Sequence, residues 1–548
     1  MKKFLKKYFA LLLFFLFLLI PLIDLLNPGL PVTHDGQDHV ARIANFYKSL
    51  SEGNIIPRWA GNLNWGYGHP VMMFLYPFPS YASSLFHLIG FSYIDSLKLV
   101  FAITFVLSGL TMYLWIKEFL GKYPAIAAGV FYVFAPYRFV DLYVRGAIGE
   151  HVAFLFLPLV LYFLLKLSKK ISYLYFLGGC LSLAGLILSH NAISLMFLPF
   201  IIFYALFLLY KNKNKTKLLL GFLGLLLLGF GLSGFFLLPA FFEGKYTLRD
   251  IVTRGEYASR FVNFKDLIYG SWSYGGTGQF TTQLGFVQLI FIVLSPYFLF
   301  QFFKKNKSFF VLSLAILAYC FLSVLLMLNF SKPVWEIVTI LQKFQFPWRL
   351  LSIVVFTTSL LGGLFVYQLN KKWQTIIVLL ITILIVLSTY NYWHANAYKI
   401  YPNLYFDKIY NGTTDTGESS PIWSIRFMEK EPKTHLVIIE GGGRVKEEKR
   451  STTEHDYTVF ADGNIKLREN TLYFPGWKVY SSGKELPVEF QDRLNRGLIT
   501  FKLPQGKNTV IIKFENTKLR TFSNLLTIFS FVFLVGLGVF VKKRNEIV

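Results

Sequence analysis

Apolar runs recur along most of this chain, and short segments rich in Lys and Arg separate them. The hydrocarbon core of a bilayer is about 30 Å thick, so a helix needs roughly 20 apolar residues to cross it. Many of the runs approach that length, and hydrophobic residues make up 54% of the sequence. A composition this apolar excludes a water-soluble enzyme. The sequence therefore predicts an α-helical polytopic membrane protein.

We predict about twelve transmembrane helices from the length of these runs. They cover residues 8–26, 97–116, 123–140, 150–166, 171–189, 192–210, 218–240, 284–303, 308–328, 349–369, 374–393 and 521–541. The first run follows a basic N-terminal segment and has no small-residue cleavage site behind it. We therefore expect an uncleaved signal anchor at this position.

The basic segments between the predicted helices define an orientation. They lie at residues 2–7, 117–122, 166–170, 211–217, 304–307, 371–372 and 542–544. With twelve spans they all fall on one side of the membrane, which the positive-inside rule makes cytoplasmic. We therefore expect a multi-pass protein of the plasma membrane with both termini in the cytoplasm. Lys and Arg number 55 against 30 Asp and Glu, but they are spread between spans rather than gathered in one patch, which argues against a nucleic-acid partner.

The first outer loop, residues 27–96, contains one more apolar run at residues 71–90. Counting this run as a span would place every later basic segment on the outside. It also carries Pro77 and Pro79, which disfavour a continuous helix. We therefore predict a re-entrant or interfacial helix here rather than a span.

The sequence changes character after the eleventh predicted helix. Runs such as 434–439 and 508–514 are strand-like, and Ser482-Gly483-Lys484 has the composition of a turn. These features predict a β-sandwich on the extracytoplasmic side. The expected domains are the membrane domain at 1–396, the extracytoplasmic β domain at 397–518, and the final transmembrane helix with a basic tail at 519–548.

Polar residues open the first outer loop directly after the first predicted helix. Asp35, Asp38, His39 and Arg42 are spaced i, i+3, i+4 and i+7, so a helix starting here would carry them on one face. A carboxylate in such a group can accept the proton of an acceptor hydroxyl or bind a divalent cation. We identify Asp35 and Asp38 as candidate catalytic residues, His39 and Arg42 as candidate substrate-binding residues, and Asp35 as a candidate metal ligand. The alternative is that the carboxylates only form a solvated helix cap.

Two later outer loops also contain ionisable residues. Glu150 lies where a predicted span begins, five residues after Arg145, and His190 lies between two closely spaced spans. Ionisable groups at this depth are costly, so they are usually paired or functional. Glu150 is a candidate catalytic residue, while Arg145 and His190 are candidate substrate-binding residues. The alternatives are an Arg145–Glu150 ion pair that only holds the loop and a His190 that only bonds between helices.

Arg349 enters another predicted span from the outer side, and Arg58 follows Ile56-Pro57 in the first outer loop. A guanidinium group can bind the phosphate of a lipid-linked substrate through two parallel hydrogen bonds. Both residues are therefore candidate substrate-binding residues. Each could equally be an interfacial anchor whose side chain reaches the lipid phosphates.

Taken in order, the motifs resemble those of the bacterial membrane-protein family with the 6-pyruvoyl-tetrahydropterin synthase-related domain. The matching motifs are His34-Asp35, Gly66-Tyr67-Gly68, Arg145 with Gly149-Glu150, Ser189-His190, Gln345 to Arg349, and Tyr473 to Val479. That family is similar to teichoic-acid-glycosylating membrane proteins and to the GT-C class of glycosyltransferases. The resemblance implies a GT-C-like helical fold, a polyprenyl-phosphate sugar donor and an acidic residue in the first outer loop, a position that Asp35 occupies. Asp38 departs from the family pattern, in which relatives more often carry an apolar or small residue.

The resemblance and the outer-side residues together predict an integral-membrane glycosyltransferase. It would move a sugar from a polyprenyl-phosphate donor to an envelope glycan or polymer acceptor on the outer side of the bilayer. Two other classes remain open from the sequence. One is a transporter or flippase of lipid-linked sugars that uses the same acids and Arg residues for binding alone. The other is a non-catalytic envelope-assembly protein.

Overall fold

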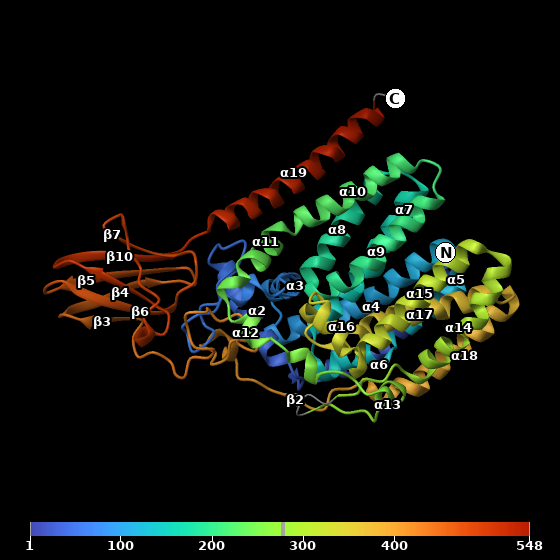
Figure 1. Ribbon diagram of the computed structural model, residues 1–548, viewed down its shortest axis with the longest axis horizontal. Helices are drawn as coiled ribbons and strands as arrows, with labels where there is room; N and C mark the ends of the chain where they lie inside the picture. Colours follow the sequence, from blue (N-terminus) through green and yellow to red (C-terminus); the bar gives the residue numbers. More distant parts are fainter. Residues whose placement is uncertain (1, 276–279, 547–548) are drawn as a thin grey trace.

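Helices form most of the computed structural model, and strands are concentrated near its C-terminal end (Figure 1). The structure describes residues 2–275 and 280–546. Long helices pack together in a bundle, and the strands project from one end of it (Figure 1). These features confirm the predicted class of a helical polytopic protein with a β region before its last helix.

Nine helices within the described residues are long and apolar enough to cross a membrane. They are α4 (Tyr93–Leu120), α7 (Ile148–Lys169), α9 (Asn191–Lys211), α10 (Lys215–Leu232), α14 (Phe286–Lys305), α15 (Lys307–Met327), α17 (Leu351–Gln368) with the preceding turn η8 (Pro347–Leu350), α18 (Lys371–Thr389) and α19 (Lys518–Glu546). Each overlaps one of the predicted spans, although the span predicted at 218–240 runs past the end of α10 at Leu232.

The other three predicted spans are less regular. Two coincide with the shorter apolar helices Leu11–Leu26 and α8 (Tyr173–Ser189). The first of these joins α1 (Lys2–Leu19) to the 3-10 helix η1 (Ile20–Leu26), a change that occurs beside Pro21, which lacks a backbone N–H. The total of twelve spans stays a prediction, because nine helices among residues 2–275 and 280–546 are each long and apolar enough to cross a membrane.

The third irregular span is a broken helix. It consists of α5 (Lys122–Val133), α6 (Pro136–Phe139) and the π-helix η3 (Val140–Arg145), with a bend of 50° at the break. Proline disfavours helical geometry in the residue before it, and Ala135 is extended there, with φ −66° and ψ 141°. The break therefore follows from Pro136, and it points the end of η3 toward the first outer loop.

The first outer loop folds into short helices. These are α2 (Gly36–Ser51), η2 (Val71–Met73) and α3 (Phe78–Leu88). The run 71–90 thus contains an 11-residue helix, which is too short to cross a bilayer unaided. This agrees with the predicted interfacial or re-entrant segment. Further short helices follow α10 and η6 (Asn329–Ser331): α11 (Gly234–Phe242), α12 (Arg249–Val252), α13 (Phe264–Ile268) and α16 (Lys332–Ile337).

Two antiparallel sheets form the β region. One sheet has the order β4-β5-β10-β7-β8 and the other has the order β3-β6-β9. The strands are β3 (Leu436–Glu440), β4 (Gly443–Arg450), β5 (Glu454–Ala461), β6 (Ile465–Leu472), β7 (Trp477–Ser481), β8 (Lys484–Leu486), β9 (Leu498–Leu503) and β10 (Gly506–Phe514). Alternate side chains such as Val459, Leu467, Phe501 and Val510 are buried in one shared core. This period of two is what a sandwich with one inner face per sheet requires.

The chain between α18 and β3 packs against the first outer loop. The short strand β2 (Tyr398–Lys399) pairs with β1 (Leu30–Pro31), and main-chain hydrogen bonds join Tyr410 to Asn62 and Asn64 to Gly412. The sandwich strands begin only at β3, so we call residues 400–433 the connecting segment. The assignment of 397–518 to one domain stays a prediction.

Cysteine labelling tests the predicted orientation. Lys213 and Lys484 are both exposed, and the two native cysteines, Cys180 and Cys320, are buried and should give little background. We expect Lys484→Cys to react with a membrane-impermeant thiol reagent in intact cells. Lys213→Cys should react only after the cells are permeabilised. Labelling of Lys213→Cys in intact cells would contradict the cytoplasmic assignment of the basic segments.

Candidate functional site

The start of α2 is fixed against the end of the π-helix η3. The backbone N–H groups of His34 and Asp35 donate to the carbonyl oxygens of Val144 and Arg145, at 3.0 and 2.9 Å. Carbonyls at a helix C-terminus lack partners within the helix, so they are free to accept these bonds. Gly146 ends η3 with φ +67°, and a Cβ on it would lie 2.4 Å from the Thr33 side chain. A glycine is needed for this close approach, which places Asp35 beside Arg145.

Asp35 occupies the N-cap position of α2, but its side chain makes no capping hydrogen bond. It is exposed, and its carboxylate has no hydrogen-bond or ion-pair partner among residues 2–275 and 280–546. The helix predicted from the spacing of the polar residues is present, and Asp35 stands at its N-cap position. The carboxylate is available to a molecule that approaches the start of α2.

Glu150 lies at the start of α7 and is 1% exposed. Its carboxylate accepts hydrogen bonds from Arg145 Nη2 at 2.9 Å, Arg349 Nε at 2.7 Å and the Tyr137 hydroxyl at 2.8 Å. His190 Nε2 is 3.9 Å from the same carboxylate. The Arg145–Glu150 pair expected as one reading of the sequence is therefore present, and Arg349 joins it from a distant part of the chain.

Asp141 completes the charge balance of this group, because it accepts a hydrogen bond from Arg145 Nη1 at 2.7 Å. We call Tyr137, Asp141, Arg145, Glu150, His190 and Arg349 the Glu150 cluster. Two carboxylates face two guanidinium groups in it, as a buried arrangement of charges requires. Arg349 donates through Nε and, at 2.8 Å, from Nη1 to the Phe344 carbonyl. Its Nη2 has no hydrogen-bond partner among the described residues, so one donor remains.

Tyr76 connects Asp35 with the Glu150 cluster. Its ring stacks on His190 with centroids 4.9 Å apart, and a Cβ on Gly149 would come within 2.2 Å of it. Burial raises the pKa of Tyr76, and the charges of four residues add smaller effects of both signs; they are Arg42, Asp35, Glu150 and Arg349. The phenol of Tyr76 therefore lies within electrostatic reach of two candidate acids, Asp35 and Glu150, and of Arg42 and Arg349.

The buried face of α2 carries His39 and Arg42. Arg42 Nη1 donates to His39 Nδ1 at 3.0 Å, and Arg42 also bonds the backbone and hydroxyl oxygens of Thr414. Burial lowers the pKa of His39 well below its usual value, and the charges of Arg42, Arg145 and His190 lower it further. His39 is therefore neutral at physiological pH.

Asp38 differs from Asp35 in having a protein partner. The Tyr410 hydroxyl donates to Asp38 Oδ1 at 2.8 Å, and the side chain is half-buried. Burial raises the pKa of Asp38, while the bond from Tyr410 and the charge of Arg42 act in the opposite direction. Since Tyr410 belongs to the connecting segment, that segment forms one wall of the site.

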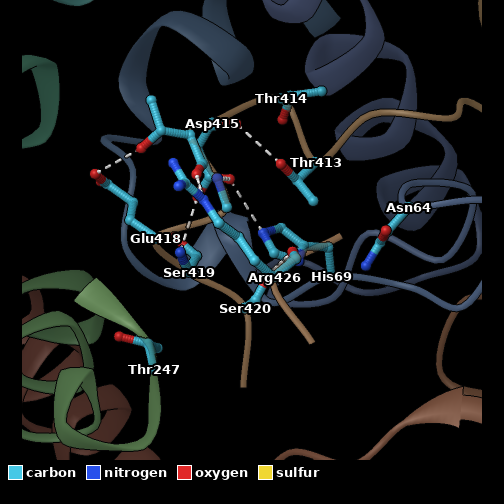
Figure 2. Close-up of polar contacts among 12 residues, drawn as sticks. Asn64, His69, Thr247, Thr413, Thr414, Asp415, Glu418, Ser419, Ser420 and Arg426 are labelled. Carbon is cyan, nitrogen blue, oxygen red and sulfur yellow. Dashed lines mark hydrogen bonds and ion pairs between the residues drawn. The ribbon is translucent and has the colours of Figure 1, made fainter. Parts of the chain in front are cut away.

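A compact turn holds the connecting segment in this position (Figure 2). Asp415 accepts hydrogen bonds from the backbone N–H groups of Gly417 at 2.9 Å and Ser419 at 3.1 Å, and it lies 3.3 Å from His69 of the first outer loop. Burial acts to raise the pKa of Asp415, but the neighbouring His69 and the bonds from Ser419 and Thr413 keep it well below its usual value. This charged turn places Thr414 against Arg42.

Arg58 lies apart from these residues. Its guanidinium donates to the Phe235 carbonyl and to the side chains of Asn516 and Asn524, at 2.8 to 3.0 Å. These partners belong to α11, the exit from the β region and α19. The structure therefore does not bring Arg58 to the Glu150 cluster, and its polar contacts with the protein are those of a residue that joins helices.

Sequence reasoning missed several members of the site, namely Tyr137, Asp141, Tyr410 and Thr414. Tyr137 lies within the predicted span 123–140 and Asp141 lies directly after it, and the polar residues Arg138 and Asp141 were the available signal. Tyr410 and Thr414 lie in a segment without periodicity, and no pattern marks them.

The structure also bears on the candidate metal site. Among residues 2–275 and 280–546, no three His, Cys, Asp or Glu side chains converge as ligands. Asp35 has a free carboxylate, whereas that of Asp38 is bonded to Tyr410. A divalent cation at Asp35 would therefore take most of its oxygen ligands from substrate and water, as Mg²⁺ often does.

The fold and site define a polytopic membrane protein whose loops and helix ends assemble a buried charged cluster beside a free carboxylate. The sequence pattern of the family described as "6-pyruvoyl-tetrahydropterin synthase related domain; membrane protein" matches residues 73–395. The chain belongs to this family.

Two further comparisons give more distant similarities. A protein of Lactococcus lactis subsp. cremoris (strain MG1363), named "Uncharacterized protein", is 30% identical over 218 residues, which are 38% of this chain and 35% of that protein. Cryo-EM structures of the mycobacterial arabinofuranosyltransferase AftD and of a variant of it align with TM-scores of 0.39 and 0.37, at 13% and 14% identity. These alignments cover 70% of this chain and 27% of AftD.

We predict that removing the charge of Glu150 strongly destabilises the protein, because Glu150 is buried and pairs with two Arg residues. Glu150→Gln leaves two buried guanidinium groups against one carboxylate, and removing one partner of a buried ion pair costs about 3–5 kcal/mol. We expect a clear fall in the thermal unfolding temperature of the purified protein.

Glu118→Gln is the matched control. Glu118 also pairs with two cations, Lys166 at 3.4 Å and Lys169 at 3.0 Å, but it is 28% exposed. Pairs of this kind contribute less than about 1 kcal/mol. Equal effects of the two substitutions would show that the Glu150 cluster does not hold the helices together.

Proposed function

We propose that this protein is a membrane glycosyltransferase of the GT-C type that uses a polyprenyl-phosphate-linked sugar as its donor. The acceptor would be an envelope glycan or polymer on the outer side of the membrane. The observation that carries the proposal is the free, exposed carboxylate of Asp35, held by a backbone hydrogen bond of 2.9 Å next to the buried Arg145. The family resemblance in the first outer loop supports the reaction type.

The reaction needs a base for the acceptor and a cation for the leaving group. In the proposed step the acceptor hydroxyl oxygen attacks the anomeric carbon of the donor sugar, and its proton passes to Asp35. The bond between the anomeric carbon and the phosphate oxygen breaks, and polyprenyl phosphate leaves with that electron pair. Arg349 Nη2, the donor that the protein leaves unused, would bind the phosphate.

The remaining charged residues would hold these two groups in place. Glu150 fixes the guanidinium plane of Arg349 through the 2.7 Å bond to Nε, so that Nη2 keeps one direction. Arg145 lies with its guanidinium 4.5 Å from the centre of the Trp348 ring, and its backbone carbonyl bonds Asp35. Preorganised donors of this kind need no rearrangement as charge develops on the leaving phosphate.

Substitution of Asp35 tests the base. Asp35→Asn keeps the size of the side chain and removes its charge, and loss of a proton-transfer group typically costs roughly 10² to 10⁴ in rate. We expect such a loss of transfer from a polyprenyl-phosphate sugar to acceptor, measured with radiolabelled donor and purified protein.

Asp250→Asn serves as the control, since Asp250 is exposed and pairs only with the exposed Lys343. Transfer by Asp35→Asn at the rate of Asp250→Asn would exclude the proposed base. Binding of the donor by the wild-type protein without any transfer, across a panel of acceptors, would instead favour a transporter or flippase.

Substitution of Arg349 tests the phosphate contact. Arg349→Lys keeps the charge but loses the planar group that bonds Glu150 and phosphate together, and a hydrogen bond to a charged group is worth about 1.5–3 kcal/mol. We expect donor binding to weaken by about tenfold to a hundredfold. The control is Arg254→Lys on the exposed surface. Unchanged donor affinity in Arg349→Lys would contradict the phosphate contact and favour the role of an interfacial anchor.

A further inference from the structure

A cavity of about 940 Å³ lies at the other end of the helical bundle from the β strands. It is bounded by the turns that join α4 to α5, α14 to α15 and α17 to α18, which are three of the basic segments of the sequence. Figure 1 shows these helices packed together on the side of the bundle away from the β region. Its volume is that of a small-molecule pocket, for which about 300–1,000 Å³ is usual.

The cavity is strongly cationic. Each of the three turns contributes one lysine to its lining: Lys122, Lys305 and Lys371. None of these lysines has a carboxylate partner among residues 2–275 and 280–546, and the lining contains no Asp or Glu. Three unpaired ammonium groups around one cavity repel each other, so a bound anion would stabilise the arrangement.

Helix geometry adds to this positive potential. The helices α5 and α18 begin at two of the lining lysines, Lys122 and Lys371. The N-terminal end of a helix carries a partial positive charge, which adds to the charge of the lysines. The three lysines make the cavity cationic even without this contribution.

The rest of the lining is both polar and aromatic. Gln301 and Gln374 supply amide groups, while Tyr297, Tyr367 and Phe309 supply rings. Tyr297 is 62% exposed and Tyr367 is 36% exposed, so these rings reach the outer surface of the bundle where lipid would surround it. Tyr367 lies at the C-terminal end of α17, where a Tyr is typically at the level of the lipid headgroups, whereas Tyr297 lies within α14. A ligand with a charged head and an apolar body matches such a lining, whereas a free anion would leave the rings unused.

We propose that this cavity binds the phosphate-bearing headgroup of an anionic phospholipid from the membrane leaflet that the basic segments face. The three lysines would contact the phosphate, the amides would bond the headgroup hydroxyls or glycerol oxygens, and the acyl chains would pass over Tyr297 and Tyr367 into the bilayer. Basic pockets between helix ends on the cytoplasmic side are suited to this class of ligand. The site is separate from Asp35 and does not depend on the proposed glycosyltransferase activity.

Lipid titration of the purified full-length protein, followed by native mass spectrometry, tests the proposal. We expect phosphatidylglycerol to bind with saturation, phosphatidylcholine to bind much more weakly, and glycerol 1-phosphate, which has the headgroup chemistry without acyl chains, to bind weakly as well. Glycerol 1-phosphate binding as tightly as phosphatidylglycerol would overturn the lipid assignment in favour of a free anion.

Two sets of variants locate the site. Lys122→Gln, Lys305→Gln and Lys371→Gln together should weaken phosphatidylglycerol binding by about a hundredfold, given the contribution expected of three lysines at an anionic headgroup. The matched control replaces three exposed lysines of the turn between α9 and α10, Lys213, Lys215 and Lys217, with Gln. An equal loss of phosphatidylglycerol binding in the control would show that the lysines act only by general electrostatic attraction, and it would contradict a specific site.

A substitution that fills the cavity tests whether the lipid enters it or only binds the lysines around it. Gln301→Trp places a large ring in the cavity and leaves every lysine in place. We expect it to abolish saturable phosphatidylglycerol binding while the thermal unfolding temperature in lipid-free detergent stays near that of the wild type. Normal lipid binding by Gln301→Trp would overturn the proposal, even if the lysine triple variant failed to fold.

Discussion

The packing of the helix ends around Glu150 depends on the hydrogen bonds that its carboxylate accepts. It accepts hydrogen bonds from Arg145 at the end of η3, from Arg349 at the entrance to α17 and from Tyr137 in α6, all within 2.7 to 2.9 Å. Charges at this depth are tolerated only when paired, so the four side chains fix the helix ends relative to one another. Because Arg145 also accepts the backbone bond of Asp35, the same interaction determines where the free carboxylate lies.

The broken helix makes this arrangement possible. A straight continuation of α5 would carry Arg145 onward along the helix axis, whereas the 50° bend before Pro136 and the π-helix η3 turn its last carbonyls toward the first outer loop. Irregular backbone of this kind is tolerated near a membrane only where its polar groups find partners, and here His34 and Asp35 supply them.

The sequence was sufficient for the polytopic helical class, for nine helices of membrane-spanning length within the described residues, and for part of the site. Lipid imposes one rule on every crossing segment, so hydropathy located the helices, and the spacing of Asp35, Asp38, His39 and Arg42 located α2 and its polar face. The Arg145–Glu150 pair was visible because both residues lie in one loop. The partner of Glu150 from η8, just before α17, was not, since 199 residues separate Arg349 from it. Arg58 had the same two interpretations as Arg349, and only tertiary packing distinguishes their positions.

The connecting segment links the β region to the polar residues of α2. Tyr410 from this segment donates a hydrogen bond to the Asp38 carboxylate, and the Thr414 carbonyl accepts one from Arg42. Asp415, next to Thr414, lies against His69 of the first outer loop and holds the segment in place. The β region is in turn held to the first outer loop, where the Thr452 backbone bonds Glu52 and Trp59 packs against Trp477. Asp38 and Arg42 are therefore freed only if the connecting segment moves, and a movement of the β region would act on them through that segment. The Asp35 carboxylate has no hydrogen bond to this segment among the described residues, so it does not depend on where the segment lies.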